Sequence, residues 1–202
     1  MKKNIHPFNS GANFGLGIYK LYLSILPAKI LRVLSWIGFK GDREEGLRLL
    51  HEAASTNTCR AMLSKLCAIA YHYVYQYQFG TVGELNGMSI NQSKDHLAQL
   101  SKVFPNCVIV QFTQGKQCQI EGQMDDAIHY FTPPEGGWTN FHHFCYWELF
   151  WSYGMMGKFK EAAQFAHKLY AESLWSPAVY SWLLATILVC SCSLELSYKK
   201  FI

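Results

Sequence analysis

Apolar residues recur along most of this chain at the three- and four-residue spacing of amphipathic helices. In the segment 28–39, for example, Ile30, Leu34 and Ile37 share one face while Lys29 lies elsewhere. Glycine and proline separate successive segments of this kind. The pattern predicts helices over residues 14–26, 28–39, 43–54, 60–79, from 89 or 91 to 104, 106–121, 123–131, 141–153, 158–172 and 173–194. Because helix follows helix with no convincing strand, the predicted class is all-α.

One of these segments admits a second interpretation. Tyr71, Tyr73, Tyr75 and Tyr77 alternate as they would in a half-buried strand. The length of the segment 60–79 and its alanine-rich beginning favour a helix. The loop that follows, 80–87, contains three of the chain's glycines.

A pattern of mostly small residues, with one phenylalanine in each copy, occurs twice at the same offsets, 35 residues apart. The first copy is Gly115, Gly122, Ala127 and Phe131, and the second is Phe150, Gly157, Ala162 and Ala166. A small residue in the first helix lets a second helix pack close, and a glycine between them permits the chain to reverse. This period is typical of tetratricopeptide-type helical hairpins that stack on one another. Gly41, Gly46 and Leu50 form a third, weaker copy.

These observations divide the chain into four parts. We expect a flexible N-terminus (1–12), N-terminal helical pairs (13–104), tetratricopeptide-like hairpins (105–190) and a divergent C-terminal tail (191–202). The segment 173–194 has no charged residue, so a membrane span is the alternative to a buried helix there.

Composition and charge restrict the location and the partners. The chain is 50% hydrophobic, too rich for a disordered protein, and its net charge is +4. Residues 1–40 carry six Lys or Arg and no acid, so the remainder is −2 and a nucleic-acid partner is not expected. Seven cysteines without a CxxC pair indicate reduced thiols and a cytoplasmic location.

No set of residues in the sequence predicts catalysis, a cofactor or a bound metal. His142 and Cys145 lie on one helical face, but zinc needs three or four ligands and spacing supplies no further partner. The acidic pairs Asp125-Asp126 and Glu44-Glu45 stand in first helical turns, where they complement the helix dipole. We therefore expect a protein that is not an enzyme.

Aromatic residues predict a binding surface. In stacked hairpins the first helix of each pair lines a concave groove. Helical offsets place the following residues there: Phe112, Lys116, Gln119, Phe144, Trp147, Trp151 and Trp182. Aromatic anchors supply much of the energy of peptide recognition, so the predicted ligand is a protein or peptide. The alternative is that the chain's own N-terminal helices cover these side chains as core.

Two stretches resemble a known family. Gly38-Phe39-Lys40-Gly41-Asp42-Arg43-Glu44-Glu45-Gly46-Leu47 and Phe141-His142-His143-Phe144-Cys145-Tyr146-Trp147-Glu148-Leu149 are similar to the tetratricopeptide repeat protein 39 family, which includes the fungal inclusion body clearance proteins. The resemblance implies a non-enzymatic α-helical repeat scaffold for protein–protein interaction, and links the fungal members to aggregate clearance at lipid droplets. Family members continue with further repeats, so we expect a fragment or truncated isoform.

Two functions compete at this point. The first is an intracellular scaffold that binds a protein partner through the aromatic groove. The second is a peripheral membrane or lipid-droplet protein anchored by the segment 14–39, which combines apolar faces with Lys20, Lys29 and Arg32.

Overall fold

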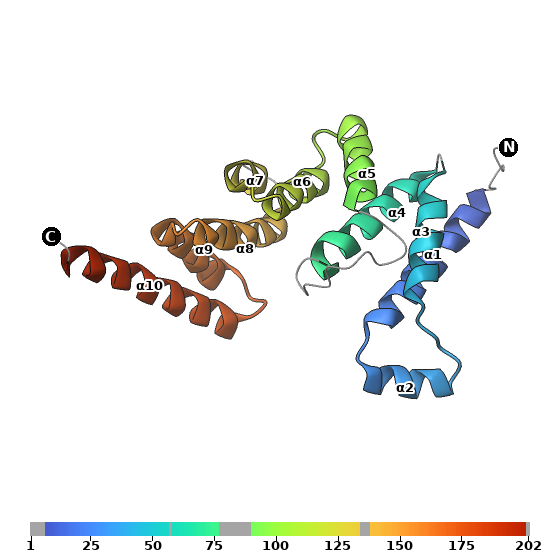
Figure 1. Cartoon of the computed structure of the whole chain (residues 1–202), viewed down its shortest axis with the longest axis horizontal. Coiled ribbons are helices and arrows are strands. Elements are labelled where there is room, and N and C mark those ends of the chain that lie inside the picture. Colours follow the sequence, from blue (N-terminus) through green and yellow to red (C-terminus); the bar gives the residue numbers. More distant parts are fainter. Residues whose placement is uncertain (1–6, 57, 77–89, 134–137, 201–202) are drawn as a thin grey trace. The chain divides into compact units, whose positions relative to one another are not determined.

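A computed structural model describes residues 7–56, 58–76, 90–133 and 138–200, and every regular element within these ranges is helical (Figure 1). The elements are α1 (Pro7–Ile25), α2 (Ala28–Trp36), α3 (Arg43–Ala54), α4 (Cys59–Ala70), the π-helix η1 (Tyr71–Gln76), α5 (Ile90–Val103), α6 (Val108–Ile120), α7 (Met124–Phe131), α8 (Thr139–Met155), α9 (Phe159–Glu172) and α10 (Pro177–Lys200). The all-α prediction is confirmed. Two compact units, residues 1–105 and 106–202, are considered separately.

The helix boundaries differ from the expected ones mainly near the two ends. Helix α1 begins at Pro7, within the segment expected to be flexible, and α10 continues to Lys200 through the expected tail. Tyr71, Tyr73 and Tyr75 are helical, in η1, and the rest of the predicted helix from Tyr77 to residue 79 lies outside the described residues. The predicted loop 80–87 lies outside the described residues.

In the first unit, α1 packs against α3 at two glycines. A Cβ added to Gly17 would lie 3.0 Å from the carbonyl oxygen of Gly46, and one added to Gly46 would lie 3.0 Å from that of Gly17. This close approach buries Leu21 on α1 together with Leu47 and Leu50 on α3. In the third copy of the repeat, Gly41 stands at the turn position, which would make α2 the helix that pairs with α3. In the structure α1 packs against α3 instead.

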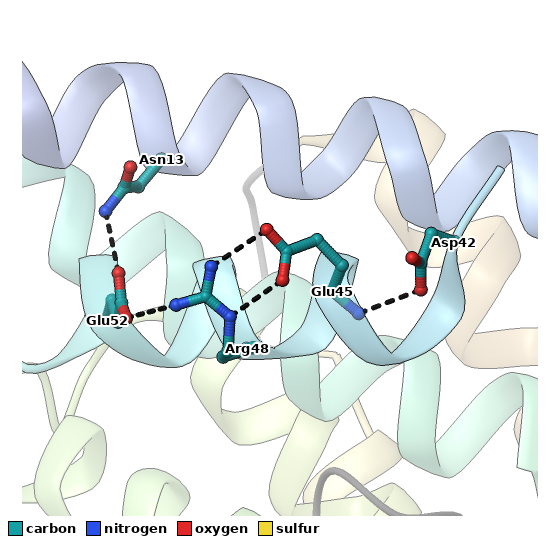
Figure 2. A network of polar contacts seen from close by, with 5 residues as sticks. All are labelled: Asn13, Asp42, Glu45, Arg48 and Glu52. Atoms are coloured by element: carbon teal, nitrogen blue, oxygen red, sulfur yellow. Dashed lines mark hydrogen bonds and ion pairs between the residues drawn. The ribbon is translucent and has the colours of Figure 1, made fainter. Parts of the chain in front are cut away.

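Polar contacts on the outer side of α3 add to this packing (Figure 2). Asp42 caps the helix by accepting a hydrogen bond from the Glu45 amide at 3.0 Å, as its position predicts. Arg48 pairs with Glu45 and with Glu52 one turn further on. Glu52 also accepts a hydrogen bond from Asn13 Nδ2 at 3.1 Å, which links α3 to α1.

Helix α2 stands apart from this packing. The chain leaves α1 and returns to it at Gly41, where an added Cβ would lie 2.5 Å from the backbone nitrogen of Ser24. The next amide, of Asp42, donates a hydrogen bond to the Lys20 carbonyl at 3.3 Å. Residues 26–40 therefore form an excursion that begins and ends beside the C-terminal part of α1, with α2 at its far side (Figure 1).

The second unit contains the two hairpins predicted from the repeat. Gly122 lies in the turn after α6 with φ +78°, and Gly157 lies in the turn after α8 with φ +71°. L side chains rarely adopt this backbone region. Both glycines lie at chain reversals, as predicted. Gly115 admits the ring of Phe131, since an added Cβ would lie 2.6 Å from Phe131 Cε1.

The second hairpin fills the same positions with the large and small residues exchanged. Phe150 stands 35 residues after Gly115 and is buried, while Ala166 stands where the first hairpin has Phe131. Phe150 and Ala166 share one core cluster with Tyr180 and Leu183 of α10. Each hairpin thus combines one aromatic ring with one small residue at this level.

Two histidines in the first unit share a partly buried contact. His96 Nε2 on α5 and His51 Nδ1 on α3 are 3.4 Å apart, so one ring donates and the other accepts. The outer nitrogens of both rings are buried and have no hydrogen-bond partner among the described residues. Burial, and then the neighbouring His51, lower the pKa of His96 from 6.5 to about 4.

This contact predicts a loss of stability in mild acid. His96 titrates near its usual 6.5 in the unfolded chain and about 4 in the folded one, so the unfolded state binds more protons between these values. Its stabilising contribution is complete above pH 6.5 and falls as the pH drops towards 4. With allowance for the half-exposed ring, we expect the wild type to lose about 1–2 kcal/mol more than His96→Gln over that window. Urea unfolding of both proteins at pH 7 and pH 4.5 measures the difference, and equal losses would contradict it.

Candidate interaction surface

A buried polar network joins the first helices of the two hairpins. Lys116 Nζ on α6 donates hydrogen bonds to Gln119 Oε1 at 2.7 Å and to Glu148 Oε2 on α8 at 2.9 Å. Gln119 Nε2 in turn donates to Ser152 Oγ at 3.2 Å. All four residues are buried, so the ion pair has little access to water. Buried charges need such pairing, and the network therefore fixes the register of α8 against α6.

Two of the predicted groove residues, Lys116 and Gln119, belong to this buried network. Lys116 and Gln119 are only 6% and 4% exposed, and their polar atoms are satisfied within the chain. Phe112 is half-buried, with its ring 5.3 Å from that of Phe131 and 5.4 Å from that of Phe141. These side chains support α8 from inside the hairpin stack, and none offers a free charge to a ligand.

An exposed aromatic row follows one side of α8. It consists of Phe144, Trp147 and Trp151, which recur at the i, i+3 and i+7 positions of one helical stripe. Phe144 is 57% and Trp151 41% exposed, whereas Trp147 is half-buried. The Trp147 ring makes edge contacts with Trp151 at 5.9 Å and with Tyr180 of α10 at 6.4 Å between centroids. The row is therefore both accessible and held in place.

The remaining predicted residue, Trp182, lies on α10. That helix buries Tyr180, Leu183 and Ile187 in the core shared with α9, and leaves Trp182 63% exposed. No ring contact joins Trp182 to the aromatic row in the part of the chain that the structure describes. The structure thus brings three of the seven predicted residues into one row, and leaves Trp182 exposed on α10, which shares a core with α9 and contacts the row through Tyr180.

Further exposed apolar side chains were not predicted as part of a surface. Leu174 and Trp175, in the connection between α9 and α10, are 93% and 86% exposed. Trp138, before α8, is exposed and stacks on Phe141. Sequence gives one signal for Leu174 and Trp175: two large apolar residues stand just before Pro177, at a helix start.

Two histidines and a cysteine lie beside the row on α8. Burial, and then the Glu148 charge, raise the pKa of Cys145 to about 11, so this thiol is protonated at neutral pH. His143 Nε2 lies 3.8 Å from Glu172 Oε2, in a partly exposed contact. Within the described ranges, no three His, Cys, Asp or Glu residues come close enough to hold a metal ion.

None of the helices in the described part of the chain, α10 among them, combines the length and the apolar character needed to cross a bilayer.

Comparisons with known proteins agree with the hairpin architecture. The family model Iml2/Tetratricopeptide repeat protein 39 matches residues 1–198. The Tetratricopeptide repeat protein ttc-39B of Caenorhabditis elegans is 35% identical over 187 residues, which cover 91% of this chain and 32% of that relative. The chain thus spans about a third of that protein's length. No solved structure shows significant similarity. The chain belongs to the Iml2/tetratricopeptide repeat protein 39 family.

Proposed function

We propose that this protein is a non-enzymatic scaffold that binds a protein or peptide through Phe144, Trp147, Trp151 and Trp182. The observation that carries the proposal is the aromatic row on α8, which is exposed to solvent. The buried ion pair between Lys116 and Glu148 holds α8 against α6. Membership in a tetratricopeptide-type family supports the general role of a helical-repeat interaction protein. The thiols of Cys67, Cys107, Cys118, Cys145 and Cys190 are free, in keeping with a cytoplasmic location.

The chemistry of the row favours an apolar ligand segment. Rigid aromatic side chains present a large contact area and lose little conformational entropy when they bind. The ion pair beneath the row is matched internally, so it adds no net charge for an acidic peptide to recognise. We therefore propose a ligand that inserts aliphatic or aromatic side chains between Phe144 and Trp151, as an amphipathic helix or an extended peptide does.

Replacing two exposed tryptophans tests this function. We expect the double variant Trp151→Ala/Trp182→Ala to capture at least about tenfold less of each partner than the wild type does. Truncating a hot-spot aromatic residue typically costs about 2 kcal/mol or more of binding free energy. Affinity capture with wild-type and variant protein, followed by quantitative mass spectrometry, measures the change for each partner.

A matched control comes from the first unit. Trp36→Ala removes an equally large exposed ring from α2 and should leave these partners bound. Far-UV circular dichroism of the double variant should match that of the wild type. If the helical signal collapses, the row serves as core, and if both variants retain the same partners, the row is not their binding surface.

The second candidate function is peripheral membrane binding through the segment 14–39. A specific observation favours it, since α2 has no buried residue and carries both basic and apolar side chains. Cosedimentation of the full chain with lipid vesicles tests this candidate, and it is removed if the protein binds no vesicle of any composition.

A further inference from the structure

The packing of the first unit makes no use of α2. No residue of Ala28–Trp36 is buried, although an isolated helix of this length is marginal in water. Leu31 and Leu34 are half-buried, and they are the only two residues of α2 that are not exposed. Because residues 26–40 leave and rejoin the unit at nearly the same point of α1, α1 and α3 can pack without this helix. The apolar side chains of α2 therefore need another explanation.

Two stripes run along the exposed side of this segment. Ile30, Val33 and Ile37 recur at i, i+3 and i+7, and are 47%, 65% and 68% exposed. A neighbouring stripe has the same spacing and consists of Lys29, Arg32 and Trp36, with Trp36 90% exposed. An apolar stripe bordered by basic residues and a tryptophan is the arrangement of helices that lie in a membrane interface.

Charge distinguishes among the surfaces that α2 would fit. Residues 1–40 contain six Lys or Arg and no acid, and the first carboxylate after α2 belongs to Asp42. Lys29 and Arg32 are exposed, and neither forms an ion pair with a described residue. A surface of negative charge over an apolar interior satisfies both stripes at once. Such a surface is that of a bilayer containing anionic phospholipid.

We propose that α2 binds the surface of an anionic phospholipid bilayer. Ile30, Val33 and Ile37 enter the boundary between headgroups and acyl chains, and Lys29 and Arg32 contact the lipid phosphates. This inference rests on the second candidate function and narrows it from the segment 14–39 to one element. Helix α1 uses part of its apolar face in the core, where Leu21 is buried and Phe14 and Ile18 pack, whereas α2 buries none of its residues.

Cosedimentation with vesicles of two compositions tests the assignment in the full chain. We expect binding to phosphatidylcholine vesicles that contain phosphatidylserine, and at least about tenfold weaker binding to phosphatidylcholine alone. Val33→Ser with Ile37→Ser, and separately Lys29→Glu with Arg32→Glu, should each weaken binding to the anionic vesicles by about tenfold or more. Since these positions are exposed, circular dichroism should show unchanged folding.

Two further variants separate a specific role of α2 from general charge. Lys102→Glu with Lys158→Glu makes the same change in net charge at exposed positions outside α2, and should retain most of the binding. Replacing residues 27–39 with a Gly-Ser linker of equal length should abolish binding and leave the packing of α1 on α3 intact.

The remaining outcomes of the vesicle experiment each contradict one part of the proposal. If the wild type binds neither vesicle, peripheral membrane binding itself fails. If it binds both vesicles equally, recognition of anionic lipid is overturned. If the Lys102/Lys158 control loses as much as the Lys29/Arg32 variant, the assignment to α2 is overturned. Membrane binding stands in either case. If the Val33/Ile37 variant binds as the wild type does, the contact is electrostatic only, as with an acidic protein surface, and insertion of the helix is wrong.

Discussion

Replacing Lys116 with Met is expected to destabilise the unit 106–202 by about 3–5 kcal/mol, because the substitution leaves Glu148 as an unpaired buried charge. The two side chains are nearly inaccessible, so water does not replace the lost ammonium group. Five of the six tryptophans lie after residue 106, so tryptophan fluorescence during urea unfolding reports this unit selectively.

The double variant shows whether the pair stabilises the fold or only specifies it. Lys116→Met with Glu148→Leu removes both charges, and we expect it to recover at least about 2 kcal/mol of the loss. A residual cost of about 1–3 kcal/mol should remain because Gln119 Oε1 loses the donor that Lys116 provides. If the double variant is as unstable as the sum of the two single variants, the pair is not coupled as the 2.9 Å contact implies.

The features that sequence predicted best have a local physical cause. A left-handed turn requires glycine at Gly122 and Gly157, and a helix start favours a carboxylate at Asp42, so the residue type itself marks the position. The small residue Gly115 likewise marks the place where Phe131 approaches, because no other side chain fits there. Such features depend on few atoms, all close in the chain or one hairpin away.

The burial of Lys116 and Gln119 does not follow from their spacing along the helix. Helical offsets assign a residue to a face of its helix, but they do not show which neighbour covers that face. The partner, Glu148, lies 32 residues away on another hairpin, and a lysine in a sequence gives no sign that it will be paired inside the protein. Glu148 falls between Trp147 and Leu149, and an isolated acid within an apolar helix is the one signal that indicates a buried partner.

The position of α2 escaped prediction for a different reason. Helices α1 and α2 both present an apolar face, and the weaker repeat, with Gly41 as its turn, favours α2 as the partner of α3. Gly17 decides between them, because only two facing glycines allow the backbones to approach as α1 and α3 do. Gly17 and Gly46 face each other in the fold, but their spacing along the chain does not predict this contact.

Gly115→Phe and Phe131→Ala should each destabilise the first hairpin, and combining them should restore most of its stability. Phe131→Ala is expected to cost about 3–5 kcal/mol by leaving a cavity. Gly115→Phe is expected to cost more than about 3 kcal/mol, because its Cβ alone would lie 2.6 Å from the fully buried ring of Phe131. Together the two changes reproduce the arrangement of Phe150 and Ala166 in the next hairpin, where the same repeat positions are packed and buried.

We expect the double variant Gly115→Phe/Phe131→Ala to lie within about 2 kcal/mol of the wild type, with a coupling energy between the sites of at least about 3 kcal/mol. Urea unfolding of all four proteins in a double-mutant cycle measures that coupling. Losses that simply add would mean that the two hairpins differ in more than the placement of one ring, and that the positions separated by 35 residues are not structurally equivalent. Recovery would show that each hairpin needs one ring and one small residue at this level, whichever helix supplies the ring.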